Sequence, residues 1–230
     1  MNGSRPANGC AIFRGALCIN KAGAGKSAAR PKWVHLWSGS SVAAETLWRY
    51  AARLSARQHV DRTNPDFAKL RAFTFDVDGV LTDGGITYLD DGRELKTFNV
   101  QDGAATKQLL DAGITIAWIT GRESPVVARR ARELGVTHLY QGQSDKRAAF
   151  IDFHTRIGSP PELTAHVGDD LPDLDLFELA GTGIAVPNAH PAVLARADWI
   201  TTLPGGRGVV RELAEHALKV RGLWSWSTTA

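Results

Sequence analysis

Cysteine is nearly absent from this chain of 230 residues, which contains two cysteines in all. Both lie near the N-terminus, at Cys10 and Cys18, and their spacing fits no usual zinc site. Residues 66–230 contain none. Most of the chain must therefore fold without disulfides, a composition that suits a reducing cytoplasm.

Long hydrophobic runs are also missing. No apolar stretch approaches the roughly 18 residues that a membrane helix requires, and the N-terminus lacks the charged-then-apolar order of a signal peptide. The sequence therefore predicts a cytoplasmic protein without a membrane segment. The seven histidines show no metal-ligand spacing. We expect His138 and His166 to pack within strands and the other five to lie at the surface.

Charge is divided unevenly along the chain. Residues 1–65 contain ten Lys and Arg against two Asp and Glu, whereas residues 66–230 contain seventeen against twenty-two. The excess of positive charge thus belongs to a basic leader, residues 1–65, which we expect to be disordered or loosely helical, with a basic amphipathic helix possible over 41–58. Residues 66–230 form a mildly acidic domain in which nothing indicates nucleic-acid binding. A P-loop at Ala22–Ser27 is excluded, because Asn20 replaces the first glycine and no apolar strand precedes it.

The most informative stretch runs from Phe73 to Gly84, with the sequence FTFDVDGVLTDG. Its apolar beginning predicts a buried strand, which ends abruptly in carboxylates and glycines. Strand alternation places Asp76 and Asp78 on the same side of the chain. Two adjacent carboxylates repel each other, so the pattern predicts either a shared proton or a bound cation. An Asp-Gly turn alone would be common, but the second acid and Leu81-Thr82-Asp83 favour a functional site.

Downstream, strands alternate with helices. This order predicts an α/β fold with a doubly wound parallel sheet covered on both faces. Two alternating runs around Asp90-Asp91-Gly92 predict a β-hairpin directly after the first strand. Asp102 is expected to cap the next helix. The predicted strands are 71–77, 114–119, 137–140, 163–167, 183–186 and 198–201, and the predicted helices are 103–112, 125–134, 145–157, 173–180, 189–197 and 209–220.

Polar clusters follow several of these strands. Thr120-Gly121-Arg122 ends the second strand, and Lys146 lies in the first turn of a later helix. Another strand ends in Gly168-Asp169-Asp170, followed by Asp173, and three acids in so short a stretch need a cation. Because ligands bind at the carboxyl ends of parallel strands, we expect these groups to converge.

In order and placement, these clusters resemble the four motifs of the haloacid dehalogenase superfamily of phosphatases. The resemblance implies a Rossmann-like fold and catalysis by Asp76, Asp78, Thr120 and Lys146. Asp76 would be the nucleophile and Asp78 the general acid and base, while Thr120 and Lys146 would bind the phosphoryl oxygens. It also implies Mg²⁺ bound by the carboxylates of Asp76 and Asp169 and the main-chain carbonyl of Asp78. Asp170 and Asp173 would hold metal-bound waters and Lys146.

The short intervals between the motifs indicate which members of the superfamily this chain resembles. Only 42 positions separate Asp78 from Thr120, and 49 separate Thr120 from Asp169, which leaves no room for a cap domain. Within the superfamily, residues 67–218 resemble the capless 3-deoxy-D-manno-octulosonate 8-phosphate phosphatases, including the Gly205-Gly206-Arg207-Gly208 segment. That resemblance implies a phosphorylated sugar-acid substrate and a homotetramer, in which hairpins pair and the tail reaches a neighbouring site. The expected substrate-binding residues are Lys96, Asp102, Gly121, Arg122 and Arg207. The Ala104-Ala105 pair and the leader depart from the family pattern.

Other functions remain open at this point. Close relatives act on nine-carbon sugar-acid 9-phosphates, or serve as non-catalytic oligomerisation domains of sugar-acid cytidylyltransferases. A two-component receiver domain also combines a strand-end Asp with Mg²⁺, Thr and Lys, but it would hold phosphate stoichiometrically instead of releasing it catalytically. The intact acids at Asp76, Asp78 and Asp169, with Thr120 and Lys146, argue for a phosphatase.

Overall fold

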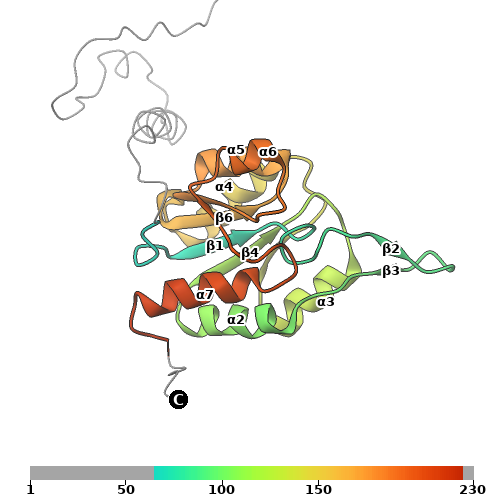
Figure 1. Cartoon of the computed structure of the whole chain (residues 1–230), viewed down its shortest axis with the longest axis horizontal. Helices are drawn as coiled ribbons and strands as arrows, with labels where there is room; N and C mark the ends of the chain where they lie inside the picture. The colour runs from blue at the N-terminus through green and yellow to red at the C-terminus, as the bar shows by residue number, and fades with distance from the viewer. Residues whose placement is uncertain (1–64, 225–230) are drawn as a thin grey trace, which may run out of the picture. The chain divides into compact units, whose positions relative to one another are not determined.

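The computed structural model describes residues 65–224 (Figure 1). The predicted helix over 41–58 and most of the basic leader lie outside these residues. The described part contains a six-stranded parallel sheet with the strand order β5-β4-β1-β6-β7-β8. The predicted doubly wound α/β fold is confirmed. The strands are β1 (Ala72–Phe75), β4 (Thr115–Ile119), β5 (His138–Tyr140), β6 (Thr164–Gly168), β7 (Thr182–Ala185) and β8 (Trp199–Ile200).

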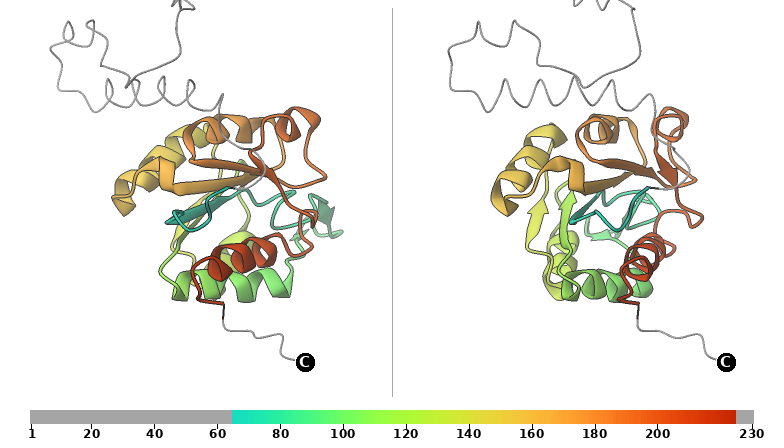
Figure 2. Two further views of the ribbon diagram at one scale, coloured as in Figure 1. Left: turned by 60° about the vertical axis from the view of Figure 1, so that its left-hand side comes forward. Right: turned by 90° about the vertical axis from the view of Figure 1, so that its left-hand side faces the viewer.

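Helices cover both faces of this sheet. Figure 2 shows α2, α3 and α7 on one face and α4, α5 and α6 on the other. The longer helices have apolar residues at helical spacing, which lets each bury one stripe against the sheet. Their bounds are α2 (Val100–Asp111), α3 (Pro125–Leu134), α4 (Lys146–Ile157), α5 (Leu174–Leu179), α6 (Pro191–Leu194) and α7 (Val209–Lys219), with short 3₁₀ turns at Pro161–Leu163 and Leu171–Asp173.

The two central strands define where a ligand can bind. From β1 the chain crosses to β4 on one side, whereas β6 lies on the other side of β1. This reversal is a topological switch point, and in such sheets ligands bind at the carboxyl ends of the flanking strands. Phe75 is paired with Val167, so Asp76 and the residues after Gly168 emerge at the same edge.

Local signals at the helix ends explain most boundaries. Ser124 and Pro125 begin α3, and Gly135 ends it in the left-handed conformation at φ 81°. Asp145 caps α4 by accepting hydrogen bonds from the main-chain N–H groups of Arg147 and Ala148. The predicted beginning of α2 was wrong. Asn99 is its N-cap, and Asp102 lies within the first turn of the helix.

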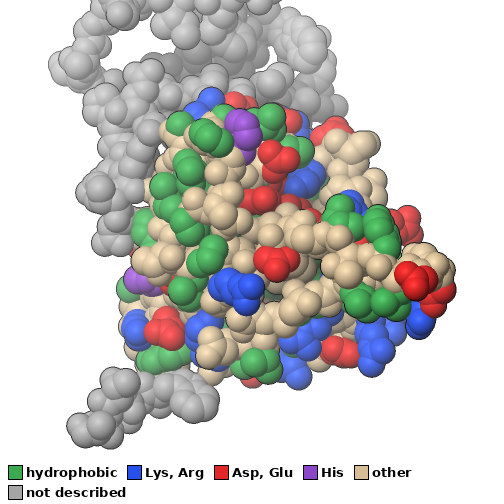
Figure 3. All heavy atoms as spheres, turned by 45° about the vertical axis from the view of Figure 1, so that its right-hand side comes forward, with side chains coloured by type: hydrophobic (Ala, Val, Ile, Leu, Met, Phe, Trp, Pro, Cys, Tyr) green, Lys and Arg blue, Asp and Glu red, His purple; other side chains and the backbone are tan. Residues whose placement is uncertain are grey.

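The predicted hairpin is present and consists of β2 (Thr87–Tyr88) and β3 (Glu94–Leu95). Within the described chain these strands pair only with each other, and the hairpin projects away from the main sheet (Figure 1). Hydrophobic side chains are exposed on it (Figure 3), namely those of Ile86, Tyr88, Leu89 and Leu95. A two-stranded ribbon with such a surface is expected to need a partner for stability.

The main hydrophobic core lies between the sheet and its helices. Phe73, Phe75 and Trp118 are among its largest fully buried side chains. Burial of both sheet faces explains why β1 is apolar at nearly every position. Within residues 65–224, no helix is long and apolar enough to cross a membrane.

Candidate active site

Asp76 lies directly after β1 and is almost completely buried. Its main-chain N–H donates to the Val167 carbonyl, which extends the pairing with β6 by one residue. The Lys146 ammonium group lies 2.9 Å from Asp76 Oδ1. Burial and the charge of Asp173 raise the pKa of Asp76 well above its usual value, while Lys146 opposes this shift. A carboxylate in this position needs further positive charge to remain ionised.

Asp169 supplies the second carboxylate of the site. Side-chain oxygens of Asp76, Asp169 and Asp173 lie within 4.8 Å of one another. Burial and Asp173 raise the pKa of Asp169 to about 6, and its Oδ1 atom is buried without a hydrogen-bond partner. The backbone of Gly79, at φ 98°, comes so close that an added Cβ would lie 2.0 Å from Asp169 Oδ2. This oxygen-rich donor set fits Mg²⁺, which prefers one or two carboxylates together with waters.

Asp173 has a supporting position, because both of its oxygens already have partners. Oδ2 accepts hydrogen bonds from the main-chain N–H groups of Asp169 (3.0 Å) and Asp170 (3.2 Å). Oδ1 accepts from Lys146 Nζ at 2.7 Å. Burial alone would raise the pKa of Asp173, but the hydrogen bond from His166 and the charge of Lys146 outweigh it and hold the pKa far below its usual value. We therefore regard Asp173 as an ionised anchor for Lys146 and for the Asp169 backbone.

The Asp78 side chain contacts residues of the hairpin and of the segment after β4. The strand ends at Phe75, and the chain then turns, with the Leu81 and Thr82 N–H groups donating to the Val77 carbonyl. The Asp78 carboxylate forms an ion pair with Lys96. Asp78 is thus not part of the group of carboxylates that Asp76 forms with Asp169 and Asp173.

The hairpin reaches the site beside Asp78. Lys96 follows β3, and its side chain is 2% exposed. Glu94, on β3, pairs with Arg122 and lies 3.8 Å from Lys96 Nζ. Arg122 Nε lies 3.9 Å from Asp78 Oδ2, and a hydrogen bond to Tyr88, with the charge of Glu94, raises the Arg122 pKa. Four charged side chains therefore form a network at the mouth of the site.

Thr120 ends β4 next to β1. Its side chain is buried, and its hydroxyl oxygen accepts a hydrogen bond from the Arg122 N–H at 3.3 Å. The Thr120 N–H donates to the Tyr140 carbonyl. Gly121 is exposed, and a Cβ there would contact only the Gln143 carbonyl oxygen, at 3.7 Å. This strand end therefore offers a hydroxyl group and an uncrowded backbone.

The Gly205–Gly208 segment packs against the loop that follows Asp76. The Gly206 N–H donates to the Val80 carbonyl at 2.9 Å, and added Cβ atoms on Gly205 or Gly206 would clash with the main chain at Gly79 and Thr82–Asp83. The segment therefore supports the loop of its own subunit. The Arg207 side chain is exposed.

The carboxylate of Asp102 is used within the fold. Oδ2 accepts a hydrogen bond from the Gly208 N–H at 3.2 Å, and Oδ1 accepts from the Arg211 N–H at 3.0 Å. Burial raises the pKa of Asp102, although these N–H groups oppose the shift. Asp102 thus caps α7 from α2, and we assign it this scaffold role instead of substrate contact.

Comparisons with known proteins agree with this geometry. The family model for haloacid dehalogenase-like hydrolases matches residues 135–213. The chain is 46% identical over 153 residues to the 3-deoxy-D-manno-octulosonate 8-phosphate phosphatase of Escherichia coli K12, covering 66% of this chain and 81% of the relative. The chain belongs to this phosphatase family.

Solved structures of the phosphatase family have the same fold. The enzyme from Yersinia pestis is similar with a TM-score of 0.67 and 42% identity, covering 68% of this chain and 85% of that one. The enzyme from Moraxella catarrhalis was solved in complex with a magnesium ion, a phosphate ion and a KDO molecule. It is similar with a TM-score of 0.66 and 45% identity, covering 68% of this chain and 91% of that one.

Three residues around this phosphatase site were not among the predicted site residues, although His166 was expected to pack within a strand. Glu94 pairs with Arg122, and the buried Thr74 and His166 lie beneath the acids. Strand alternation could have found Thr74 and His166, because they share a face with Asp76 and Gly168 in adjacent strands. The surface position expected for His154 was wrong, since this side chain is buried against Phe150.

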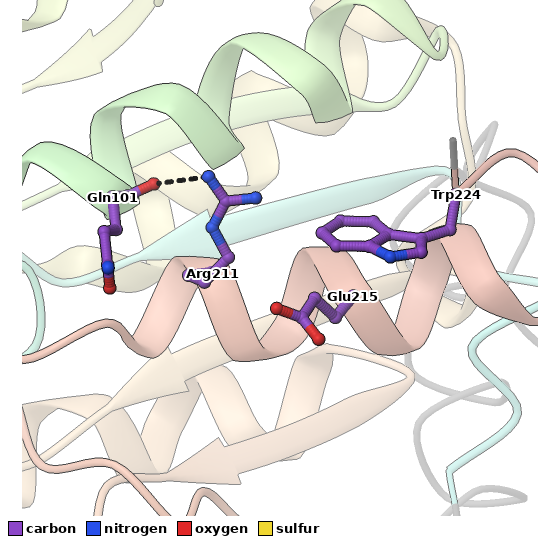
Figure 4. A pocket seen from close by; sticks show the side chains of 4 residues that line it. All are labelled: Gln101, Arg211, Glu215 and Trp224. Atoms are coloured by element: carbon purple, nitrogen blue, oxygen red, sulfur yellow. Dashed lines mark hydrogen bonds between the residues drawn. The ribbon is translucent and has the colours of Figure 1, made fainter. Parts of the chain in front are cut away.

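A pocket elsewhere on the phosphatase contains none of the clustered acids. It is lined by Gln101, Arg211, Glu215 and Trp224 (Figure 4). The Arg211 guanidinium lies 5.7 Å from the centre of the Trp224 ring and donates to the Gln101 carbonyl, so the pocket is part of the packing of α7 on α2. We therefore place the candidate active site at the carboxyl ends of the strands and not in this pocket.

Proposed function

We propose that this protein is a Mg²⁺-dependent phosphatase that hydrolyses 3-deoxy-D-manno-octulosonate 8-phosphate through an aspartyl-phosphate intermediate. The observation that supports this most strongly is the buried Asp76 carboxylate, held 2.9 Å from the Lys146 ammonium group and grouped with Asp169. The 46% identity to the 3-deoxy-D-manno-octulosonate 8-phosphate phosphatase of Escherichia coli K12 supports the substrate. Release of this sugar acid would serve lipopolysaccharide synthesis, and we place the reaction in the cytoplasm.

In the first step, an Asp76 oxygen attacks the phosphorus atom, and the bond from phosphorus to the sugar oxygen breaks. Asp78, in its protonated form, donates a proton to the departing sugar oxygen, so the sugar acid leaves as an alcohol. Lys146 and Thr120 would stabilise the negative charge on the phosphoryl oxygens. The burial of Lys146 opposes its charge, but Asp173 and Asp76 outweigh this and raise the Lys146 pKa, which favours the protonated side chain.

In the second step, a water molecule attacks the phosphorus atom of aspartyl phosphate. Asp78, now ionised, takes a proton from this water, and the bond to the Asp76 oxygen breaks to release inorganic phosphate. The carboxylates of Asp76 and Asp169, with the Asp78 carbonyl, would hold Mg²⁺. The ion would supply Lewis-acid charge compensation to the carboxylates and the phosphate.

Substrate selection in a capless site must come from elements at its mouth. Arg122 can grip a carboxylate or a phosphate with two parallel hydrogen bonds, and Lys96 can add a point charge. Both belong to the charged network at the hairpin base. Arg207 is exposed on the Gly205–Gly208 segment and is free to serve a neighbouring subunit's site.

The hairpin also supports a homotetramer. Tyr88 on β2 is 63% exposed, and Ile86 just before this strand is 53% exposed. The outer edges of β2 and β3 have no partner among residues 65–224. Pairing with hairpins of other subunits would satisfy these edges and bury the apolar side chains. The double variant Ile86→Lys and Leu95→Lys should reduce the mass measured by light scattering. Val220→Lys, which alters an exposed apolar residue outside the hairpin, should not.

The substrate is tested with a panel of phosphorylated 2-keto-3-deoxy sugar acids in the presence of Mg²⁺. The eight-carbon 8-phosphate should have a higher kcat/KM than the nine-carbon 9-phosphates, with phosphate released over many turnovers. A preference for a nine-carbon ester would reassign the substrate. Release of no more than one phosphate per subunit would instead indicate a receiver-like protein.

A further inference from the structure

The strand residues beneath the site form a buried chain of polar contacts. Thr74 on β1 and His166 on β6 are register partners in adjacent strands. Both are fully buried, and Thr74 Oγ1 lies 2.8 Å from His166 Nδ1. On its other side, His166 Nε2 lies 3.2 Å from Asp173 Oδ1. The imidazole therefore contacts polar groups at both ring nitrogens within the buried sheet.

This chain continues to the predicted nucleophile. Asp173 Oδ1 also accepts from Lys146 Nζ at 2.7 Å, and the same nitrogen lies 2.9 Å from Asp76 Oδ1. One oxygen of Asp173 therefore holds both His166 and Lys146. Movement of that oxygen would displace the cation that stabilises Asp76.

The partners determine which His166 nitrogen carries the proton. Both Asp173 oxygens already accept hydrogen bonds, from two main-chain N–H groups and from Lys146, so Asp173 acts as an acceptor and His166 Nε2 donates to it. Nδ1 then accepts from the Thr74 hydroxyl group. Complete burial lowers the pKa of His166, which favours the neutral ring. Phe177 meets the ring edge-on, with 5.9 Å between ring centres, and restricts its rotation.

We propose that His166 is a positioning residue, which Thr74 holds as the Nε2–H tautomer and which fixes Asp173 so that Lys146 remains against Asp76. The inference rests on the proposed phosphatase function. His166 touches neither substrate nor metal in this scheme. Its contribution comes from preorganisation, because a carboxylate bonded at fixed positions need not reorient as charge develops on the phosphate.

The tautomer is tested first, by NMR on the wild-type full chain with ¹⁵N-labelled histidine. The His166 signals are assigned by their loss in the His166→Gln variant. The expected result is a neutral ring with a slowly exchanging proton on Nε2. A proton on Nδ1, an imidazolium ion or rapid exchange would overturn the proposal. This measurement does not depend on any substrate, so it separates the proposal from the proposed function.

Steady-state kinetics then test whether the hydrogen bond between His166 and Asp173 positions Lys146. His166→Phe removes both hydrogen bonds, whereas His166→Gln retains a donor near the position of Nε2. The Phe variant should lose kcat by roughly 10- to 100-fold, the range for one hydrogen bond to a charged group, with KM changed less than about twofold. The Gln variant should recover most of this loss. Equal losses in the two variants would contradict the positioning role.

Two controls make the result specific. His138→Phe alters another strand histidine, which packs edge-on against Phe153 away from the acids, and it should leave kcat unchanged. Thr74→Val should lower kcat and mix the His166 tautomers, whereas Thr74→Ser retains the hydroxyl group and should change neither. Thermal unfolding gives the folded fraction of every variant. A loss of kcat in His166→Phe that merely follows this fraction would overturn the proposal.

Discussion

Gly205 lies directly against the main chain of Gly79. A Cβ on Gly205 would come within 1.8 Å of the Gly79 carbonyl oxygen and within 2.9 Å of the Thr82 carbonyl oxygen. These two glycines are 126 positions apart, and one of them belongs to the loop that carries Asp78. The start of α7 therefore fixes the loop after the predicted nucleophile.

Gly205→Ala should displace this loop and disable the site without unfolding the sheet. Steady-state hydrolysis of a sugar-acid phosphate should fall more than about tenfold, because small displacements of catalytic groups are costly. Gly113→Ala is the control. It places a methyl group in open space at φ 76° and should cost about 1 kcal/mol of stability without loss of kcat. Equal kcat in the two variants would refute the supporting role of Gly205.

Asp76→Asn should abolish turnover, because an amide cannot form the aspartyl phosphate. Asp78→Asn should lower kcat by roughly 10²- to 10⁴-fold, the range for loss of general acid and base catalysis. Rapid quenching and mass spectrometry should detect a phosphorylated peptide in the wild type and none in Asp76→Asn. Asp111→Asn, at an exposed acid on α2, should behave like the wild type. Near-normal turnover by Asp76→Asn would exclude the covalent route.

Removal of divalent ions by EDTA should abolish turnover, and Mg²⁺ should restore it. Ca²⁺ should inhibit, because its larger and looser coordination shell would misplace Asp76 relative to the phosphate. Mg²⁺ should also raise the Tm of the wild type, since a ligand that binds only the folded state stabilises it. In Asp169→Asn this rise should be much smaller. Full activity after exhaustive EDTA treatment would remove the metal from the mechanism.

Protonation of His154 should destabilise the protein in mild acid. Burial lowers the pKa of His154, whereas in the unfolded chain it should be near 6.5. The folded state therefore binds fewer protons, and stability present above about pH 6.5 is lost as the pH falls. Between pH 7 and pH 5, the free energy of unfolding measured in urea should decrease more steeply in the wild type than in His154→Phe. The difference should be at most about 1.4 kcal/mol per pH unit, and parallel curves would contradict this assignment.

Arg207→Ala should reduce kcat/KM for the sugar-acid phosphate more than for a small generic phosphate ester. The reason is that only the sugar-acid phosphate has a carboxylate that Arg207 can bind. If Arg207 serves a neighbouring site, mixing Arg207→Ala with Asp76→Asn subunits should recover activity where hybrid tetramers form. Equal losses on both substrates would exclude a role in selectivity. Absence of recovery would confine Arg207 to its own subunit.

Local sequence patterns were enough to predict the sheet and the edge at which the site lies. Alternating apolar strands and helices predicted the doubly wound fold, and acids at strand ends predicted where the site would lie. These inferences succeed because the side-chain periodicity and the strand-end chemistry are local properties of the chain. The same reasoning identified Asp76, Lys146 and Asp169, which the structure brings together.

Contacts between residues far apart in the chain determine which acids lie together and which polar residues support them. Alternation related Asp76 to Asp78, whereas the fold also groups Asp76 with Asp169 and Asp173 and pairs Asp78 with Lys96. Asp102 caps α7 from α2 through hydrogen bonds that span more than a hundred positions. Such contacts depend on strand order and on the angle at which helices pack, and no local pattern in the sequence encodes them.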